Sequence, residues 1–417
     1  MRTDRTVVVG GGIVGLCCAL QLQRQGVATL LLDPARSQPS ASWGNAGHIA
    51  IEQTEPLASR KMIRSAPRQL SVVGGALALP PRQVRHWLPF MMRMVAASRP
   101  DRYEAGRIAL STLLAEAMPA WRRLSSSLPR GDLLIEQGHF VVWQDPDAAA
   151  RGLAAWRQTD TGGARFHAAR SEELDRLAGV MARRPAGAIV FENTGQVADP
   201  AAVCHTLDQA FSQAGGERRR GLARAITITN DRAELLTQDG DRILPRQILI
   251  AAGVESGALM ESIGARVPIV AERGYHIQAA RHGWPIDMPP VVFEERSMIV
   301  TRFESSLRAA SFVEFGHIDA PPDPRKWQRL ERHVSALGLP VDGPFTRWMG
   351  ARPTLPDYLP AIGRARQAAN LFYAFGHHHL GLTLGPVTGE ILAALMTDQP
   401  RAMDLERYAV DRFQRRA

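Results

Sequence analysis

The hydrophobic pattern opens with a short apolar run, a glycine-rich turn and a stretch of helical periodicity. Residues 6–9 are Thr-Val-Val-Val, and the glycine-rich segment 10–15 follows them directly. Apolar positions then recur at helical spacing until Gly26, a residue type that commonly ends a helix. A second apolar run, residues 28–32, ends at Asp33. Since near-continuous apolar strands are buried on both faces, the pattern predicts a strand, turn, helix and strand with the two strands parallel.

The stretch from residue 51 to 129 is predicted to be mostly helical. Several prolines divide it into short pieces, because proline interrupts a helix interior. Its segment from Trp87 to Ala97 is the most apolar of the chain, and we interpret it either as core or as a surface patch.

The rest of the chain alternates between strand-like and helical patterns. Strand-like runs separated by turn signals are expected at 225–229, 234–237 and 243–250, in the long stretch 267–315, and at 370–375. Helices are expected after the proline-rich segment 321–324 and at 386–396, where Pro386 occupies the first turn. Between the last strand and the last helix lies a turn rich in glycine and histidine.

Composition places the chain among ordinary globular proteins. It is 45% hydrophobic and 22% charged, which excludes disorder, collagen and coiled coil. Three cysteines, two of them adjacent (Cys17 and Cys18), give neither a disulfide framework nor a CxxC site, so a reducing cytoplasmic setting is expected. No apolar run reaches the roughly 20 residues of a spanning helix, and no signal peptide is expected.

The net charge of +9 raises the question of an anionic partner. Lysine occurs only at positions 61 and 326, so 48 of the 50 basic residues are arginine, an imbalance typical of codon bias. No long basic face is evident from the sequence, and no nucleic-acid partner is expected.

The first glycines form a GxGxxG pattern with a carboxylate at a suitable distance. Gly10, Gly12 and Gly15 permit a tight turn and close approach to a pyrophosphate at the N-terminus of the following helix. Asp33, 18 residues after Gly15, is placed to bind an adenosine ribose. The pattern predicts a dinucleotide site, with NAD and FAD both open. The alternative is a glycine turn that only packs a helix on a strand.

Seven short segments in order resemble the FAD-dependent amino acid oxidoreductases of the D-amino acid oxidase superfamily, most closely the bacterial D-amino acid dehydrogenases. The resemblance runs nearly end to end and is looser over residues 51–129. The segments are 10–15, 42–49 (Ser-Trp-Gly-Asn-Ala-Gly-His-Ile), 195–200, 251–253, 272–276 (Glu-Arg-Gly-Tyr-His), 350–353 (Gly-Ala-Arg-Pro) and 376–383.

The resemblance implies FAD as the cofactor. The loop 43–49, rich in small residues, would lie against the flavin, the alternative being an ordinary glycine loop. The turn 380–383 would direct backbone N–H groups at the negative charge of reduced flavin. The residues expected to bind FAD are Gly10, Gly12, Ile13, Val14, Gly15, Asp33, Pro34, Ser42, Gly44, Asn45, Ala46, Gly47, His48, Ile49, Ala252, Gly253, His379, Leu380, Gly381, Leu382 and Thr383.

The resemblance also implies an amino acid substrate held by Arg352. A guanidinium fork suits a carboxylate, although an interdomain arginine is the alternative. Tyr275 is expected to reach the same carboxylate, or else to pack in the core. His379 is a candidate for amine or ring recognition, and His48 faces the flavin and substrate or is an ordinary histidine. No metal is expected, because the histidines at 377–379 lack a partner at ligand spacing.

The implied reaction is hydride transfer from the substrate Cα to flavin N5, giving an imino acid. It needs no protein acid or base, and activity should rise with pH as the bound amine deprotonates. We favour D-hydroxyproline and D-proline. The alternatives are a broad D-amino acid dehydrogenase acting on D-alanine, a glycine or sarcosine oxidase, an FAD-dependent tRNA-modifying enzyme, and a non-catalytic nucleotide-binding module.

The expected fold is α/β with α+β character, in two domains. A discontinuous Rossmann-like FAD domain comprises residues 1–50, 196–265 and 347–417, and an antiparallel-sheet substrate domain comprises 130–195 and 266–346. The patch from Trp87 to Ala97 is bordered by arginines at 82, 85, 93 and 99. It suggests peripheral contact with the inner membrane and electron delivery to a quinone, in a protein otherwise cytoplasmic.

Overall fold

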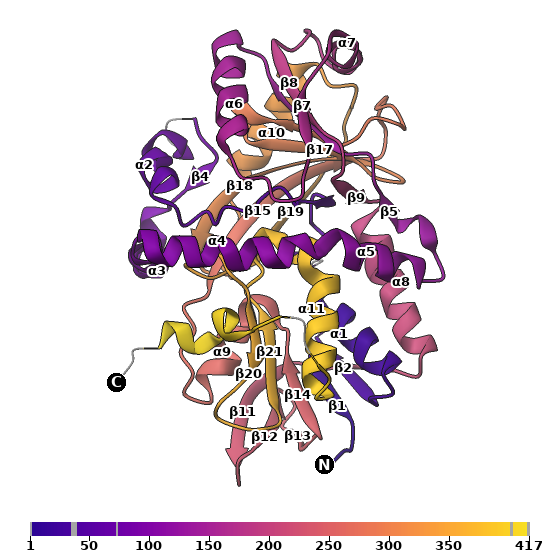
Figure 1. The fold of residues 1–417 in the computed structure, drawn as a ribbon, viewed down its shortest axis with the longest axis vertical. Coiled ribbons are helices and arrows are strands. Elements are labelled where there is room, and N and C mark those ends of the chain that lie inside the picture. The colour runs from indigo at the N-terminus through magenta and orange to yellow at the C-terminus, as the bar shows by residue number, and fades with distance from the viewer. Residues whose placement is uncertain (1, 35–39, 72–73, 401–402, 415–417) are drawn as a thin grey trace.

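The computed structural model describes residues 2–34, 40–71, 74–400 and 403–414. A six-stranded sheet forms the lower half of the molecule (Figure 1). Five of its strands are parallel and the edge strand β20 is antiparallel. In spatial order they are β10 (Glu217–Arg220), β2 (Thr29–Asp33), β1 (Thr6–Val9), β14 (Gln247–Ile250), β21 (Leu371–Phe375) and β20 (Ala361–Arg364). The predicted parallel pairing of the first two strands is confirmed, while β10 lies on a basic run that the pattern did not identify as a strand.

Helices pack against this sheet. α1 (Ile13–Arg24) contacts α8 (Pro200–Gln213) and α11 (Gly381–Met396). α11 also contacts α4 (Pro100–Ala115) and α5 (Ala117–Ser126), which run across the middle of the molecule (Figure 1). The stretch 378–396 is long and apolar enough to cross a membrane, but 72% of it is buried inside the protein, as in a core helix.

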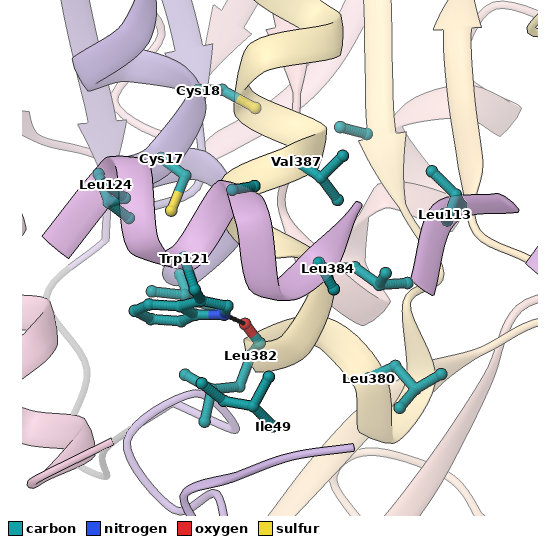
Figure 2. Close-up of a cluster of buried hydrophobic side chains, with 14 of the residues drawn as sticks. Cys17, Cys18, Ile49, Leu113, Trp121, Leu124, Leu380, Leu382, Leu384 and Val387 are labelled. Atoms are coloured by element: carbon teal, nitrogen blue, oxygen red, sulfur yellow. Dashed lines mark hydrogen bonds between the residues drawn. The ribbon is translucent and has the colours of Figure 1, made fainter. Parts of the chain in front are cut away.

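α11 begins five residues earlier than the sequence predicted. Proline at position 386 lacks the N–H that would bond to the carbonyl of Leu382, four residues before it. The buried indole of Trp121 on α5 donates to that carbonyl instead, at 3.1 Å (Figure 2). Pro386 therefore lies inside the helix without leaving a buried carbonyl unpaired.

A nine-stranded, mostly antiparallel sheet forms the upper half (Figure 1). Its strands, in spatial order, are β19 (Thr346–Thr354), β15 (Val270–Ala279), β18 (Leu307–Gly316), β17 (Met298–Arg302), β16 (Val291–Phe293), β6 (His139–Trp143), β8 (Gly187–Phe191) and β7 (Phe166–Ala168), with β4 (Leu77–Ala78) paired to β18. α10 (Pro324–Leu337) packs on β15 and β18, α6 (Pro146–Gln158) packs on β6 and β8, and α7 (Ser171–Ala178) lies near this end. The strand-like stretch 267–315 is confirmed.

Two smaller sheets complete the fold. The strand-like runs predicted at 225–229 and 234–237 form a small antiparallel sheet of β11 (Ala223–Thr229), β12 (Arg232–Thr237) and β13 (Arg242–Ile243), with α9 (Ser256–Glu261) beside it. The run predicted at 243–250 is divided between β13 and β14 of the parallel sheet. The other small sheet joins β3 (His48–Ile49), β9 (Gly195–Val197) and β5 (Leu134–Ile135). The expected fold class, a Rossmann-like sheet with a second antiparallel sheet, is confirmed.

The stretch 51–129 is mostly helical, as predicted. Besides α4 and α5 it contains α2 (Arg60–Gln69) and α3 (Val84–Ala97). The apolar segment from Trp87 to Ala97 is both core and surface, because Phe90 and Met94 of α3 are buried while Met92 is exposed.

One predicted domain boundary differs from the structure. Residues 347–354 were placed with the parallel sheet, but they form β19, which pairs with β15 along its whole length. This pairing joins strands some 80 residues apart, so hydrophobic periodicity alone does not show it.

Candidate active site

The glycine turn after β1 is too tight for any side chain. Gly10 has a φ of +109°, and a Cβ there would lie 2.4 Å from the carbonyl oxygen of Ala251. A Cβ at Gly15 would lie 1.9 Å from the carbonyl oxygen of Gly10. Gly12 is the N-cap of α1 and offers no side-chain cap. The turn thus brings the N-terminus of α1, the positive end of the helix, close to the end of β14.

Asp33 and Ser42 approach this turn from other parts of the chain. The N–H of Gly11 donates to Asp33 Oδ1 at 2.8 Å, and the N–H of Ile13 donates to Ser42 Oγ at 3.0 Å. Asp33 Oδ2 lies 3.1 Å from Nη2 of Arg218 on β10. Pro34 follows Asp33 and is half-buried.

The loop before β3 is fixed by side chains of the nine-stranded sheet. Arg308 on β18 donates to the carbonyl oxygens of Trp43, at 3.1 Å, and Asn45. His276 Nδ1 lies 3.1 Å from the carbonyl oxygen of Gly44. Burial lowers the pKa of Arg308 to about 10, so it stays charged at neutral pH. The sequence reading missed Arg308, because nothing in its local pattern connects β18 to this loop.

The remaining predicted cofactor segments meet the same edge of the parallel sheet. Thr383, in the first turn of α11, accepts the N–H of Ala50 at 3.0 Å. Ala252 and Gly253 follow β14, and Cα of Ala252 would lie 2.8 Å from a Cβ at Gly10. All the predicted segments therefore converge at the carboxyl ends of the parallel strands, where ligands bind in open α/β sheets. They are Gly10 to Gly15, Asp33, Pro34, Ser42 to Ile49, Ala252, Gly253 and Leu380 to Thr383.

Arg352 lies on β19, and its side chain crosses Gly274 of the neighbouring strand β15. Its Nη1 donates to Oε1 of Glu272 at 3.0 Å. A Cβ at Gly274 of β15 would lie 2.4 Å from Arg352 Nη2, so this position has no room for a side chain. The side chain of Arg352 is 26% exposed, and no partner of Nε or Nη2 is found in the part of the chain that the structure describes. The guanidinium thus has donors left for a ligand.

The buried Glu272 fixes the position of Arg352 by accepting its hydrogen bond. It is 1% exposed, and its Oε2 accepts hydrogen bonds from Thr354 Oγ1 at 3.0 Å and from the Tyr358 hydroxyl at 3.3 Å. Burial, and after it the charge of Glu272, raises the pKa of Tyr358 well above its usual value, so Tyr358 remains a donor. Neither Glu272 nor Tyr358 was assigned a role from the sequence.

Strained backbone surrounds this arginine. Phe312, whose carbonyl accepts from Arg352 Nη1 at 3.3 Å, has a φ of +71°. Tyr358 and His378 have φ values of +56° and +42°, and they are joined by a 3.0 Å contact between His378 Nε2 and the Tyr358 carbonyl oxygen. Positive φ in residues with side chains is costly and collects at functional sites.

His379 ends a chain of hydrogen bonds. Its Nδ1 lies 3.0 Å from Nδ1 of His378, and its Nε2 lies 2.5 Å from the amide of Gln53. His378 Nε2 must donate to the Tyr358 carbonyl, so a neutral His378 accepts at Nδ1 and His379 donates there. His379 Nε2 is then an acceptor, so a hydrogen bond to Gln53 requires the amide nitrogen in the position of Oε1, which lies 2.5 Å from Nε2. Burial, and then Arg352, lowers the pKa of His379 to about 3.

Tyr275 is not beside Arg352, contrary to the sequence prediction. Residues of one strand alternate between faces, and Arg352 pairs with Glu272, so Tyr275 lies on the opposite face of β15. Its hydroxyl donates to Oε1 of Glu314 at 3.1 Å and accepts the N–H of Asp323 at 3.2 Å. Tyr275 is the packed core tyrosine that the sequence left as the alternative.

His48 belongs to a buried polar cluster at the junction of the sheets. Its Nε2 lies 3.0 Å from Glu52 Oε1, and its ring lies 4.3 Å from that of His139. Burial raises the pKa of Glu52, but the neighbouring His48 outweighs it, and the pKa falls to about 2. Burial lowers the pKa of His139 to about 3. His48 Nδ1 and Glu52 Oε2 are buried and have no hydrogen-bond partner in the described part of the chain.

His48, Glu52 and His139 also bring together side chains that can ligate a metal ion, a grouping that the sequence analysis did not predict. Ligand atoms of His48, Glu52 and His139 lie within 4.8 Å of one another, whereas ligands of a tetrahedral zinc ion are about 3.4 Å apart. The adjacent histidines 377–379 diverge, since His377 contacts Thr388 Oγ1 at 3.0 Å while its neighbours face Tyr358 and Gln53.

Comparison with known proteins gives one family across almost the whole chain. The family model described as FAD dependent oxidoreductase (DAO) matches residues 5–395. The D-amino-acid oxidase of Bradyrhizobium diazoefficiens is 27% identical over 416 residues, covering 97% of this chain and 98% of that protein. The D-amino acid dehydrogenase of Vibrio vulnificus is 25% identical, covering 97% and 100%. Among solved structures, iminodiacetate oxidase from Chelativorans sp. BNC1 shares the fold with a TM-score of 0.72 and 22% identity, covering 97% and 98%.

Proposed function

The chain belongs to the FAD dependent oxidoreductase family (DAO), and we propose that it oxidises a D-amino acid, with cyclic secondary amines of the D-proline and D-hydroxyproline type preferred. The names of the two curated relatives support a D-amino acid. The cyclic preference is supported by the resemblance of segments 272–276 and 376–383, and by the aromatic surface beside Arg352.

The residues at the carboxyl edge of the parallel sheet fit FAD. Gly10 and Gly15 have no room for a Cβ, because the carbonyl oxygens of Ala251 and Gly10 lie there, so they keep the β1–α1 turn as tight as a pyrophosphate site requires. Ser42 Oγ accepts one N–H of the first turn of α1, and the N-cap residue of neither α1 nor α11 caps its own helix with a side chain, so both positive helix ends suit negative charge. Asp33 supplies the carboxylate for ribose hydroxyls. The loop 42–49 and the turn 380–383 would hold the flavin end, and bound FAD supplies the acceptor for a hydride from the substrate Cα.

Arg352 is the observation that carries the proposal. A carboxylate is the natural ligand of a guanidinium fork that has two nitrogens without partners among the described residues. The bond to Glu272 fixes the orientation of the fork, and Thr354 and Tyr358 hold Glu272 in turn. Folding therefore already fixes the arginine side chain, and substrate binding does not carry the entropic cost of ordering it.

The indole of Trp348 forms an aromatic surface on the same face of β19 as Arg352. A Cβ at either Gly44 or Gly350 would lie 2.1 Å from this indole. The indole stacks on His276, with ring centroids 4.8 Å apart and an angle of 17° between the planes. Trp348 and Arg352 are four residues apart on β19 and therefore lie on the same face of the strand, where an aromatic ring suits a substrate ring better than it suits glycine.

The proposal assigns no acid or base to the protein. His379 is neutral at physiological pH because its pKa is lowered to about 3, and it therefore does not repel an approaching amine. We expect activity to rise with pH as the substrate amine loses its proton. No inflection from this histidine should appear near pH 6.5, the usual value for a histidine side chain.

The test is anaerobic mixing of the holoenzyme with D- and L-amino acids while the visible flavin band is recorded. D-Proline and cis-4-hydroxy-D-proline should bleach the band, and L-proline should not. Bleaching chiefly by D-alanine would replace the cyclic preference with a broad one, and bleaching by glycine or sarcosine would remove the D-amino acid assignment. Bleaching by no amino acid would overturn the proposal. Readmission of air, compared with addition of a soluble quinone, then identifies the electron acceptor.

A further inference from the structure

Helix α3 is apolar on its exposed side as well as on its buried side. Phe90 and Met94 pack into a small cluster with residues of β15 and β18. The opposite side carries an exposed apolar stripe at spacings of four, four and three residues, which places its members in one line. The stripe consists of Val84 (42% exposed), Leu88 (45%), Met92 (66%) and Val95 (53%). A surface helix ordinarily presents polar side chains on this side.

The excess positive charge of the chain is concentrated around this stripe. Residues 56–100 contain eight basic residues and no acidic one, so they account for eight of the nine excess charges. All eight side chains are exposed: Arg60, Lys61, Arg64, Arg68, Arg82, Arg85, Arg93 and Arg99. Among the described residues, none of the eight is paired with a carboxylate, whereas Arg107 pairs with Glu104 and Asp160. The sequence analysis identified four of these residues beside the apolar segment, and the structure adds the four basic residues of α2.

α2 and α3 present these charges on one side of the molecule. α2 has no buried residue, and its Ile63 packs against the same small cluster as Trp87 and Met91 of α3. Figure 1 shows the two helices one above the other at the left edge. The surface formed by α2, the exposed stripe of α3 and the eight basic residues is called the basic apolar face below.

We propose that the basic apolar face docks on an anionic lipid bilayer. The bilayer interface accepts an apolar stripe between headgroups and attracts surrounding arginines to its negative charge, so it satisfies both features at once. A second copy of the chain would bring eight unpaired positive charges against eight others. A nucleic acid would use the charges but not the apolar stripe.

Docking would bring the membrane close to Arg352, since only the cluster beneath α3 lies between them. The cluster beneath α3 contains Tyr358, whose hydroxyl bonds to Glu272, the partner of Arg352. The proposal does not depend on the proposed substrate, and its test measures binding rather than turnover.

The experiment is flotation of the holoenzyme with vesicles of phosphatidylcholine alone and of phosphatidylcholine with about a third phosphatidylglycerol. The wild type should float only with the anionic vesicles, and raised salt should weaken binding. Leu88→Glu with Met92→Glu should lower the bound fraction at least about tenfold, and so should Arg85→Glu with Arg93→Glu. The visible flavin absorbance and the melting temperature confirm that each variant is folded.

The matched control is Arg183→Glu with Ile286→Glu, which removes an exposed arginine and an apolar side chain that is 78% exposed, both outside the face. It should bind like the wild type. Equal loss in the control and in the α3 variants would overturn the proposal. So would absence of vesicle binding, a dimer that Leu88→Glu with Met92→Glu dissociates, or tighter binding to an RNA or DNA oligomer than to the anionic vesicles.

Discussion

At the scale of single residues, Arg352 is the side chain on which substrate binding depends. Arg352→Ala should lower kcat/KM for the best amino acid about a hundredfold or more. Charge-assisted hydrogen bonds are each worth about 1.5–3 kcal/mol, and the variant would lose two. The effect should appear mainly in KM, because the carboxylate is bound alike before and during reaction. Steady-state kinetics with several substrate concentrations measures it.

Arg347 on the same strand is the matched control. It is exposed and pairs with Glu331, away from Glu272. Arg347→Ala should leave kcat/KM within about twofold, since exposed ion pairs contribute little. An Arg352→Ala enzyme with unchanged kcat/KM would remove the carboxylate-binding role.

Tyr275 shows what could not be predicted from the sequence at the scale of single residues. The segment Glu272 to His276 was correctly identified as a strand, but the face that Tyr275 occupies depends on which residue of β19 lies opposite Glu272. That register is a long-range property, and a shift of one residue exchanges the two faces. Arg352 was located by its motif, whereas its partner Glu272 needed the pairing itself.

At the scale of elements, the β1–α1 turn packs against the chain that leaves the end of β14, at Gly10 and Ala251. Gly10→Ala should yield a protein with a much lower ratio of flavin absorbance to protein absorbance. The new Cβ would press on the carbonyl of Ala251 in the β14 turn, and the φ of +109° is unfavourable for alanine. Absorbance spectra after incubation with FAD measure the loss.

Gly26→Ala separates strain from contact. Gly26 also has a positive φ, +78°, but a Cβ there would have no atom within 4 Å. This variant should bind FAD normally and lose only about 1 kcal/mol of stability. Equal flavin loss in both variants would mean that backbone strain, rather than closure of the cofactor turn, is responsible.

The start of α11 shows a second kind of limit. Proline in the first turn of a helix is a sound local rule, and it placed the start at Pro386. The structure extends the helix to Gly381 because Trp121, 261 residues before Leu382, donates to the Leu382 carbonyl that Pro386 leaves unbonded. The sequence assigned no role to Trp121 and gave Leu382 only as a residue of the cofactor-binding turn.

At the scale of the whole molecule, the sequence located one sheet better than the other. Parallel strands that are buried on both faces give continuous apolar runs, so β1, β2, β14 and β21 were visible. The basic run of β10 and the membership of β19 in the second sheet were not, because each is decided by a neighbouring strand. The cofactor segments converge for the same topological reason that made them predictable.

Buried neutral histidines are expected to make the whole fold sensitive to mild acid. Burial lowers the pKa values of His139, His276 and His377 to about 3. Between pH 6.5 and 3 the unfolded chain therefore binds protons that the folded chain does not, so stability falls as pH falls. From pH 7.5 to 5.5 each histidine should cost about 1.4 kcal/mol, or roughly 4 kcal/mol together. Urea unfolding with saturating FAD at both pH values measures the difference.

A variant tests whether these histidines are the cause. His377→Asn removes one titrating group and keeps a polar side chain facing Thr388, so the loss of stability between pH 7.5 and 5.5 should shrink by about 1.4 kcal/mol. Carboxylates titrate mostly below this window, and Glu52, with a pKa near 2, adds its loss only in stronger acid. Stability that is constant or rises on going to pH 5.5 would mean that the folded protein admits protons to these rings, and hence water to the core around the site.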